Sequence, residues 1–280
     1  SERNANRRFK KLDWILYRLT QRCIHGVVAN SHAGAQSHRG VFGLPESYYR
    51  VVHNGVDNDR FRPQDRTAAR RALGISDPCL VVGNVSNFKP QKNHAMLLRA
   101  FRSVLNSFPD ARLLLVGARP VDSRGRHNGY QSEVIRWIDD LNIRERVMLL
   151  GHQEELERFY PACDVTVLSS RHEGTPNVLL ESMACGVPVV ATRVCDNEYI
   201  VKDGEVGYLV DMEDDAAMAD RIELILSDSA RRQEMGRKAR QWVCEEFSTR
   251  RLAEKMEAIY LEFLSQKDKT NSQHTRLAQT

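Results

Sequence analysis

The sequence predicts an α/β protein whose main domain is a doubly wound parallel sheet. The chain has 280 residues, room for about two domains, and it is 41% hydrophobic and 28% charged, which is typical of a globular protein. From about residue 67 onward, short apolar runs alternate with amphipathic helical segments, the pattern of a parallel sheet covered on both faces. One run, 163–170, ends in small polar residues before a glycine loop, a helix and another strand. This βαβ pattern places a ligand-binding edge at the carboxyl end of the strand.

The first 65 residues contain too few strands for a complete domain. The expected elements are strands at 26–31 and 49–53, a short helix near 33–42, and a turn with a linker over 54–66. Two parallel strands have unsatisfied edges and too little apolar area to be stable alone. We therefore expect residues 1–65 to be the last portion of a longer domain, and the start at Ser1 suggests a fragment or a processed chain.

Residues 66–266 form the second predicted domain, in which strands and helices alternate. The expected strands lie at 79–83, 112–117, 147–151, 164–168, 188–192 and 207–210. The expected helices lie at 94–107, 131–141, 154–162, 176–185, 214–227, 229–246 and 249–265. Residues 267–280 are mostly polar, and we expect this tail to be disordered.

The charge distribution does not favour nucleic-acid binding. The net charge is +4, but residues 1–24 carry seven basic and two acidic side chains, so this segment holds +5 and the remainder about −1. Apolar residues recur in this segment at helical spacing, which fits packing onto a neighbouring domain or, as the alternative, peripheral contact with an anionic membrane surface. No apolar run reaches the roughly 18 residues of a membrane span, and no secretory signal is visible.

Cysteine and acidic residues predict a cytoplasmic protein without a metal site. The six cysteines show no CxxC spacing, which favours free thiols in a reducing compartment. The acidic triplet at 57–59 falls in a turn, and the acidic cluster at 211–215 has the position of a helix N-terminal cap. Neither predicts bound metal.

The most informative motif runs over 172–181. Thr175 is expected to cap a helix, with Pro176 as its first residue, and Gly186 is expected to end that helix. Backbone N–H groups at 177–178 would then point out of a positive helix end, which can hold a phosphate.

Two glutamates flank this helix start. Carboxylates accept hydrogen bonds from hydroxyls, so Glu173 and Glu181 around a phosphate seat predict a nucleotide-sugar site. A plain interpretation is that one glutamate only complements the helix dipole, but the βαβ setting favours a binding role.

A lysine-bearing loop follows the first strand of the same domain. Lys89 and Lys92 lie on 86–94, at the ligand edge of the predicted sheet, where they could neutralise a diphosphate. The alternative is an ordinary pair of solvated lysines.

At these residues the chain resembles the retaining glycosyltransferases of family 4, which share the two-domain GT-B fold with two Rossmann-like domains. The resemblance covers nearly all of residues 20–265. The matching segments are 173–181, 184–192 and 204–210, with 28–31, 54–57 and Phe61 upstream.

The resemblance implies a role for each motif residue. Glu173 would face the donor sugar and Lys92 the phosphates, and we take these two as the catalytic residues. Glu181 would bind the ribose. The other residues implied in donor binding are Gly174, Thr175, Pro176, Asn177, Val178, Lys89 and Asn87.

Two departures from the family pattern stand out. Many members carry Gly-Arg where this chain has Ser86 and Asn87, and Asn87 cannot supply a cation. Lys89, two positions on, is our hypothesis for its replacement. The first domain is also shortened, so this chain alone is expected to bind donor without transferring it.

The implied activity is transfer of a hexose-type sugar from a nucleoside-diphosphate sugar to a glycan or lipid-linked acceptor, with retention of configuration. No metal or other cofactor is expected. Polysaccharide or cell-envelope synthesis at the inner face of the membrane is the implied setting. The alternatives are a sugar-nucleotide epimerase or phosphorylase on the same fold, and a non-catalytic nucleotide-sugar-binding module.

Overall fold

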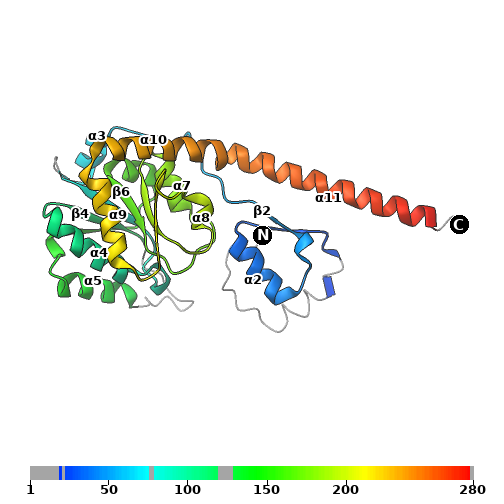
Figure 1. The fold of residues 1–280 in the computed structure, drawn as a ribbon, viewed down its shortest axis with the longest axis horizontal. Coiled ribbons are helices and arrows are strands. Elements are labelled where there is room, and N and C mark those ends of the chain that lie inside the picture. The colour runs from blue at the N-terminus through cyan, green and yellow to red at the C-terminus, as the bar shows by residue number, and fades with distance from the viewer. Residues whose placement is uncertain (1–18, 21–22, 76–78, 119–128, 278–280) are drawn as a thin grey trace. The chain divides into compact units, whose positions relative to one another are not determined.

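The computed structural model describes residues 19–20, 23–75, 79–118 and 129–277 (Figure 1). Its contacts define two units, one of residues 1–55 with 249–280, the other of residues 56–248. The unit boundary thus lies between Gly55 and Val56, earlier than the domain boundary expected at residue 65, and the last helix groups with the first unit. Most of the basic segment 1–24 lies outside the described residues.

The larger unit is built on a parallel six-stranded sheet with the order β5-β4-β3-β6-β7-β8. The strands are β3 (Val81–Val85), β4 (Arg112–Val116), β5 (Val147–Gly151), β6 (Val165–Leu168), β7 (Val189–Thr192) and β8 (Gly207–Val210). The chain builds outward from β3 to β5, then returns to build from β6 to β8. The strand order therefore reverses between β3 and β6, and ligands bind at such a switch point in open α/β sheets.

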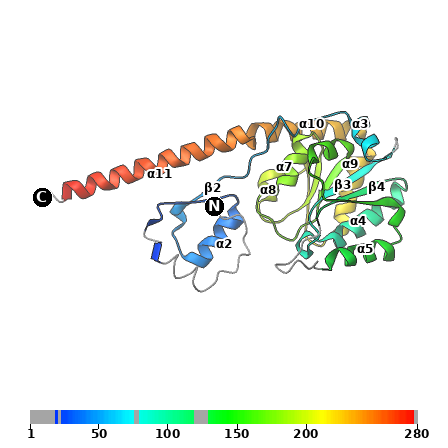
Figure 2. The same cartoon turned by 180° about the vertical axis from the view of Figure 1, so that it is seen from behind.

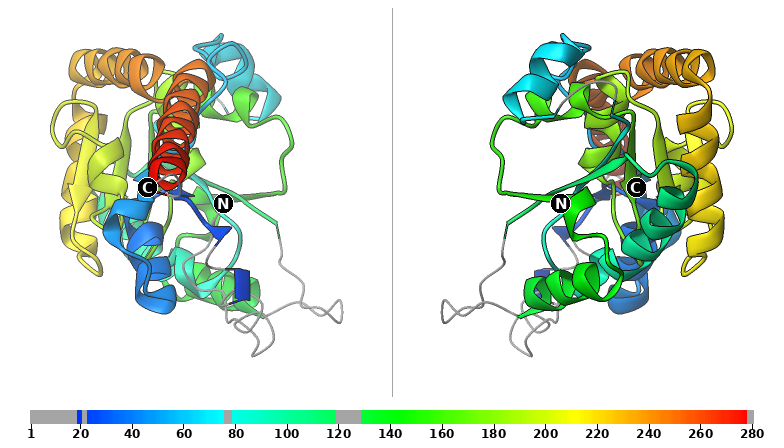
Figure 3. Two further views of the ribbon diagram at one scale, coloured as in Figure 1. Left: turned by 90° about the vertical axis from the view of Figure 1, so that its right-hand side faces the viewer. Right: turned by 90° about the vertical axis from the view of Figure 1, so that its left-hand side faces the viewer.

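Helices cover both faces of this sheet, as expected for a doubly wound fold (Figure 2, Figure 3). The helices are α3 (Arg66–Ala72), α4 (His94–Ser107), α5 (Tyr130–Asp140), α6 (Leu156–Phe159), α7 (Asn177–Ala184), α8 (Asn197–Ile200), α9 (Asp215–Ser227) and α10 (Ser229–Glu246).

Each face of the sheet has its own apolar core because side chains alternate along a strand. Val82 belongs to the core that includes Phe101 of α4, whereas its neighbour Val81 belongs to the core that includes Leu180 of α7 and Val243 of α10. Burial of such a side chain contributes about 1.5–3 kcal/mol each.

The smaller unit contains the two strands that the sequence predicts. β1 (Val27–Ala29) pairs in parallel with β2 (Tyr49–Val51), and α2 (His32–Phe42) lies between them in sequence. The Ser31 hydroxyl accepts a hydrogen bond from the N–H of Gly34 at 3.0 Å and caps α2, which ends where Gly43 takes a φ of 68°.

The last helix continues into the segment 267–280, for which the sequence predicts a disordered tail. Helix α11 runs over Thr249–Leu277, and only 278–280 lie outside the described residues. The segment contains neither glycine nor proline, so nothing interrupts the helical hydrogen bonds, and a polar composition alone does not prevent a helix. In the same unit, Arg50 Nε donates to Glu262 Oε2 at 3.1 Å.

Two short helices were not anticipated from the sequence. α3 begins after Asp65, whose carboxylate accepts from the N–H groups of Thr67 and Ala68 at 2.9 and 3.2 Å. α8 has four residues, too few to show helical periodicity. Within the described ranges, no helix is both long enough and apolar enough to cross a membrane.

Candidate functional site

The two predicted catalytic residues meet at the switch point of the sheet. Lys92 ends a 3-10 turn, η3 (Pro90–Lys92), that follows β3, and Glu173 lies in the loop that follows β6. The distance from Lys92 Nζ to Glu173 Oε1 is 2.5 Å. The two side chains are 19% and 10% exposed, so this ion pair is screened less than one on the open surface. Two residues 81 positions apart in the sequence thus form one ion pair.

Hydrogen bonds join the two loops that carry this pair. The Gln91 side-chain amide donates to the carbonyl of His172 at 2.6 Å, and the Ser169 hydroxyl donates to the carbonyl of Lys92 at 2.9 Å. The N–H of Arg171 donates to the carbonyl of Gln91 at 2.9 Å. Because the backbone of η3 is held at both Gln91 and Lys92, the lysine side chain starts from a fixed position.

A second ion pair supports the same turn from outside. Arg171 Nε donates to Glu213 Oε1 at 2.8 Å, and Arg171 Nη1 donates to the carbonyl of Pro90 at 3.2 Å. Asn93 Nδ2 also donates to Glu213 Oε1, at 3.1 Å. Burial acts to raise the pKa of Glu213, but the hydrogen bonds from Arg171 and Asn93 outweigh it and lower that pKa. No sequence signal marks Arg171, and the sequence places Glu213 in the acidic cluster 211–215 with a capping role rather than in this ion pair.

The start of helix α7 differs by one residue from the prediction. α7 begins at Asn177, and Pro176 occupies the cap position, so Thr175 is not the cap residue. Pro176 has a ψ of 104°, which is extended rather than helical, and proline has no side-chain acceptor for a capping bond. Thr175 and Pro176 are buried and Asn177 is exposed.

Glu181 lies in the next turn of α7 and has its own buried partner. The Tyr160 hydroxyl donates to Glu181 Oε2 at 2.8 Å, and Tyr160 is completely buried. Burial raises the pKa of Glu181, and the hydrogen bond from Tyr160 offsets part of that rise. Burial together with Glu181 raises the pKa of Tyr160 well above its usual value, so the phenol remains a donor. Tyr160 was not singled out from the sequence.

Lys89 and Asn87 do not join the Lys92–Glu173 pair. Lys89 is exposed, and within the described ranges its ammonium makes no ion pair with a carboxylate. Asn87 Oδ1 accepts a hydrogen bond from the N–H of Ala118 at 3.2 Å, which ties this loop to the end of β4. Asn87 therefore has a structural contact where the family pattern has a cation.

A buried polar chain lies behind the lysine loop. The Ser86 hydroxyl donates to Asn84 Oδ1 at 2.8 Å and lies 3.1 Å from His94 Nε2. Because this hydroxyl proton goes to Asn84, Ser86 accepts from His94 Nε2–H. Burial, reinforced by the charge of Lys92, lowers the pKa of His94 to about 4. The imidazole is therefore neutral at pH 7.

The acidic groups that resemble metal ligands in the sequence have structural roles. Asp57 Oδ1 accepts from the N–H groups of Asp59 and Arg60, both at 3.0 Å, which forms a turn. Asp214 Oδ1 accepts from the N–H of Ala217 at 2.8 Å and caps α9. Both contacts agree with the turn and cap assignments made from the sequence.

Family models identify the class of protein that this fold and site define. Residues 65–242 match the model of glycosyl transferases group 1, and residues 2–60 match the model of glycosyltransferase family 4. The chain belongs to the group 1 glycosyltransferases. The resemblance seen in the sequence motifs is thus confirmed.

Curated relatives agree with this assignment. The chain is 30% identical over 220 residues to the N-acetyl-alpha-D-glucosaminyl L-malate synthase of Bacillus anthracis, covering 79% of this chain and 55% of that protein. It is 36% identical over 203 residues to the D-inositol 3-phosphate glycosyltransferase of Mycobacterium sp. (strain KMS), covering 72% and 44%. The chain therefore spans about half the length of these relatives.

Solved structures confirm the fold. A glycosyltransferase from Rickettsia africae superposes with a TM-score of 0.79 at 21% identity, covering 92% of this chain and 68% of that one. The Anabaena protein HepE, in complex with UDP and glucose, also gives 0.79, at 23% identity, covering 90% and 67%. The predicted α/β fold of the GT-B type is therefore correct.

Proposed function

We propose that residues 56–248 bind a nucleoside-diphosphate sugar, as the donor half of a retaining hexose-type glycosyltransferase. The observation that carries this proposal is the Lys92–Glu173 ion pair at the switch point of the sheet. A cation and a carboxylate at that edge match the two ends of the ligand, since the phosphates require positive charge and the sugar hydroxyls require an acceptor.

Lys92 is the residue proposed to stabilise the diphosphate as it leaves the sugar. Cleavage of the bond between the sugar and the diphosphate leaves negative charge on the phosphate oxygens. A fixed ammonium stabilises that charge more in the transition state than in the ground state. The positive end of α7, with the backbone of Gly174 to Val178, would add N–H donors to the same oxygens. Lys89, which is exposed, is the proposed second cation.

Glu173 is the proposed orienting group for the sugar. One carboxylate oxygen, Oε1, contacts Lys92 and leaves Oε2 as a hydroxyl acceptor. Glu181 is the proposed ribose acceptor, because Tyr160 occupies its Oε2 and leaves Oε1. Neither glutamate is assigned as a nucleophile. The proposed scheme uses no metal and no cofactor besides the donor.

The proposed acceptor is a glycan or a lipid-linked molecule, used in the cytoplasm at the inner face of the membrane. The relatives support only a hydroxyl-bearing acceptor in general, since their names include L-malate and inositol 3-phosphate. A non-catalytic nucleotide-sugar-binding module is the second candidate.

A nucleotide-sugar panel tests the donor assignment directly. We expect at least one nucleotide sugar to raise the melting temperature of this chain, and Glu173→Gln to reduce that rise while the free nucleoside diphosphate binds as before. Glu245→Gln, an exposed glutamate on α10, is the matched control. If no nucleotide sugar stabilises the chain, the donor assignment is wrong. Release of free sugar from a bound donor would separate an active enzyme from a binding module.

A further inference from the structure

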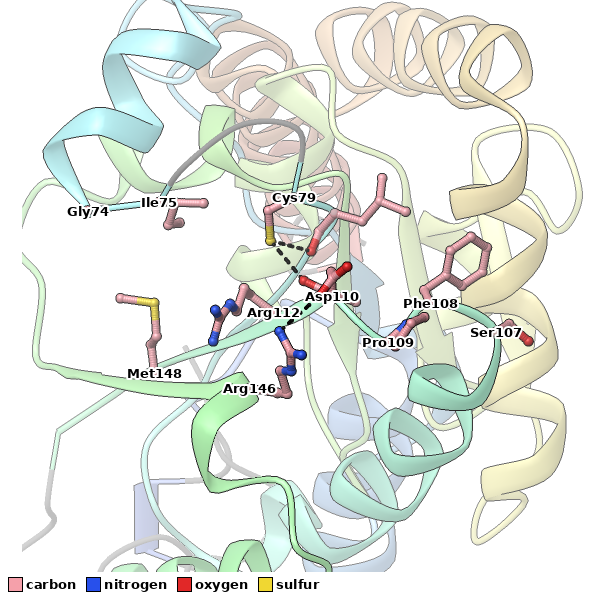
Figure 4. A pocket seen from close by; sticks show the side chains of 12 residues that line it. Gly74, Ile75, Cys79, Ser107, Phe108, Pro109, Asp110, Arg112, Arg146 and Met148 are labelled. Atoms are coloured by element: carbon pink, nitrogen blue, oxygen red, sulfur yellow. Dashed lines mark hydrogen bonds and ion pairs between the residues drawn. The ribbon is translucent and has the colours of Figure 1, made fainter.

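A cavity of about 600 Å³ lies at the edge of the sheet opposite to Lys92 and Glu173 (Figure 4). Its described lining comes from Gly74 and Ile75 after α3, from Cys79 and Leu80 before β3, from the turn after α4, and from Arg146 of η4 (Arg144–Arg146) before β5. Its volume falls within the range of small-molecule sites in proteins, about 300–1,000 Å³. The donor site proposed above does not use it.

One wall of this cavity carries surplus positive charge. Arg146 Nη1 lies 3.2 Å from Asp110 Oδ1, so these two charges offset each other. Arg112 Nη1 donates to the backbone carbonyl of Glu145, and no carboxylate in the part of the chain that the structure describes forms an ion pair with Arg112. Among the lining residues that the structure describes, two arginines thus face one aspartate, and a guanidinium without a carboxylate partner favours an anionic ligand.

The other wall is apolar. Ile75 and Met148 lie on one side of the two guanidinium groups, and Phe108 contributes on the other (Figure 4). Met148 is only half-buried although it lies on the sheet, so part of its surface is available to a ligand. A purely ionic ligand would leave this wall exposed to water.

We propose that this cavity is a second binding site, for a small amphipathic anion with a carboxylate or phosphate monoester head and an apolar body. The head would pair with Arg112, and the body would cover Ile75 and Met148. The competing explanation is that Arg112 only fastens the start of β4 to the carbonyl of Glu145. The two explanations differ in whether the charge of Arg112 matters to a ligand.

Cys79 provides a reporter inside the cavity. Its thiol donates to the carbonyls of Asp110 and Leu80 at 3.2 and 3.4 Å, and the side chain lies beside Arg112 (Figure 4). Burial raises the pKa of Cys79, and Arg112 offsets part of this rise. A ligand in the cavity would shield the thiol from a disulfide reagent. Because Arg112 itself affects the thiol, the quantity to compare is the ratio of labelling rates with and without the probe.

The test uses the chain with Cys23, Cys195 and Cys244 replaced by serine, which leaves Cys79 with the two buried cysteines. The probes are octanoate and octyl phosphate, with 1-octanol and acetate as matched molecules that lack the charge or the chain. We expect both amphipathic anions to slow Cys79 labelling at concentrations where octanol and acetate do not. Whichever of octanoate and octyl phosphate protects Cys79 at the lower concentration shows whether the site prefers a carboxylate or a phosphate head group.

Substitutions then assign the effect to Arg112. Arg112→Gln should weaken the protection by about tenfold or more, since a lost hydrogen bond to a charged group is of that size. Arg112→Lys should retain part of it, and Arg102→Gln, an exposed arginine on α4, should change nothing. Met148→Glu leaves residue 112 unchanged but places a negative charge in the cavity that competes with the anion for Arg112, so it should also abolish protection. Equal protection by octanol, or full protection in Arg112→Gln or Met148→Glu, would overturn the proposal.

Discussion

Tyr160 donates its hydroxyl proton to Glu181 across 2.8 Å, from a side chain with no exposed surface. Glu181 is otherwise a half-buried carboxylate whose pKa is raised by burial. The phenol fixes one carboxylate oxygen and favours the ionised form of the group. A ribose hydroxyl would then meet an acceptor that is already oriented.

Tyr160→Phe removes only that hydroxyl. We expect nucleoside-diphosphate affinity to fall by roughly tenfold, because Glu181 loses a charge-assisted hydrogen bond and becomes easier to protonate. The loss should grow as pH decreases toward the raised pKa of Glu181. Titration calorimetry at two pH values measures both effects. Tyr260→Phe, an exposed tyrosine on α11, is the control, and an unchanged affinity in Tyr160→Phe would remove its positioning role.

Arg171 bonds both to Glu213 and to the backbone of η3, so replacing Arg171 should displace Lys92. Arg171 itself is not among the residues proposed to contact the ligand. We expect Arg171→Met to weaken donor binding by about tenfold, since misplacing a charged contact costs on the order of 1–2 kcal/mol. Arg171→Lys should recover part of the affinity. Arg144→Met removes another exposed, ion-paired arginine far from the site and should have no effect. Equal affinities in Arg171→Met and the wild type would show that Gln91 and Ser169 suffice to hold the turn.

His94 makes stability depend on pH. Its pKa in the folded protein is about 4, below the ordinary value of 6.5, so the unfolded chain binds more protons between these values. The folded state therefore loses stability as pH falls from 6.5 toward 4, by up to about 3 kcal/mol from this group at 1.36 kcal/mol per unit. His94→Gln should flatten this part of the profile. Urea unfolding across that range checks it, and parallel profiles for both proteins would contradict it.

Local sequence signals are enough to predict the fold and the two loops that carry Lys92 and Glu173. Gly186 takes a φ of 77°, and its N–H and that of Val187 bond back to the carbonyls of Met183 and Ser182, as expected for a helix-ending glycine. The loop carrying Lys92 and the loop carrying Glu173 each follow a strand that periodicity predicts, and parallel strands bring their carboxyl ends to one edge. The contact between them follows from topology.

The supporting residues could not be predicted in this way. Tyr160 and Glu181 come from different elements, and so do Arg171 and Glu213, which are 42 positions apart. Tyr160 and Arg171 are unremarkable in their own segments, and the motifs that contain Glu181 and Glu213 do not reveal these partners, because only tertiary packing pairs them. The shift of the α7 start from Pro176 to Asn177 is of another kind, because the proline ring fixes φ but not ψ, and the ψ of 104° keeps Pro176 outside the helix.

The central claim is that Lys92 and Glu173 act together on one donor molecule. A double-mutant cycle on nucleotide-sugar affinity, with Lys92→Met, Glu173→Gln and the double variant, measures it by titration calorimetry with the best ligand of the panel. We expect each single change to weaken binding and the double change to cost less or more than their sum by about 1 kcal/mol, as for residues in direct contact. Strictly additive effects, or unchanged affinity in both single variants, would contradict the account.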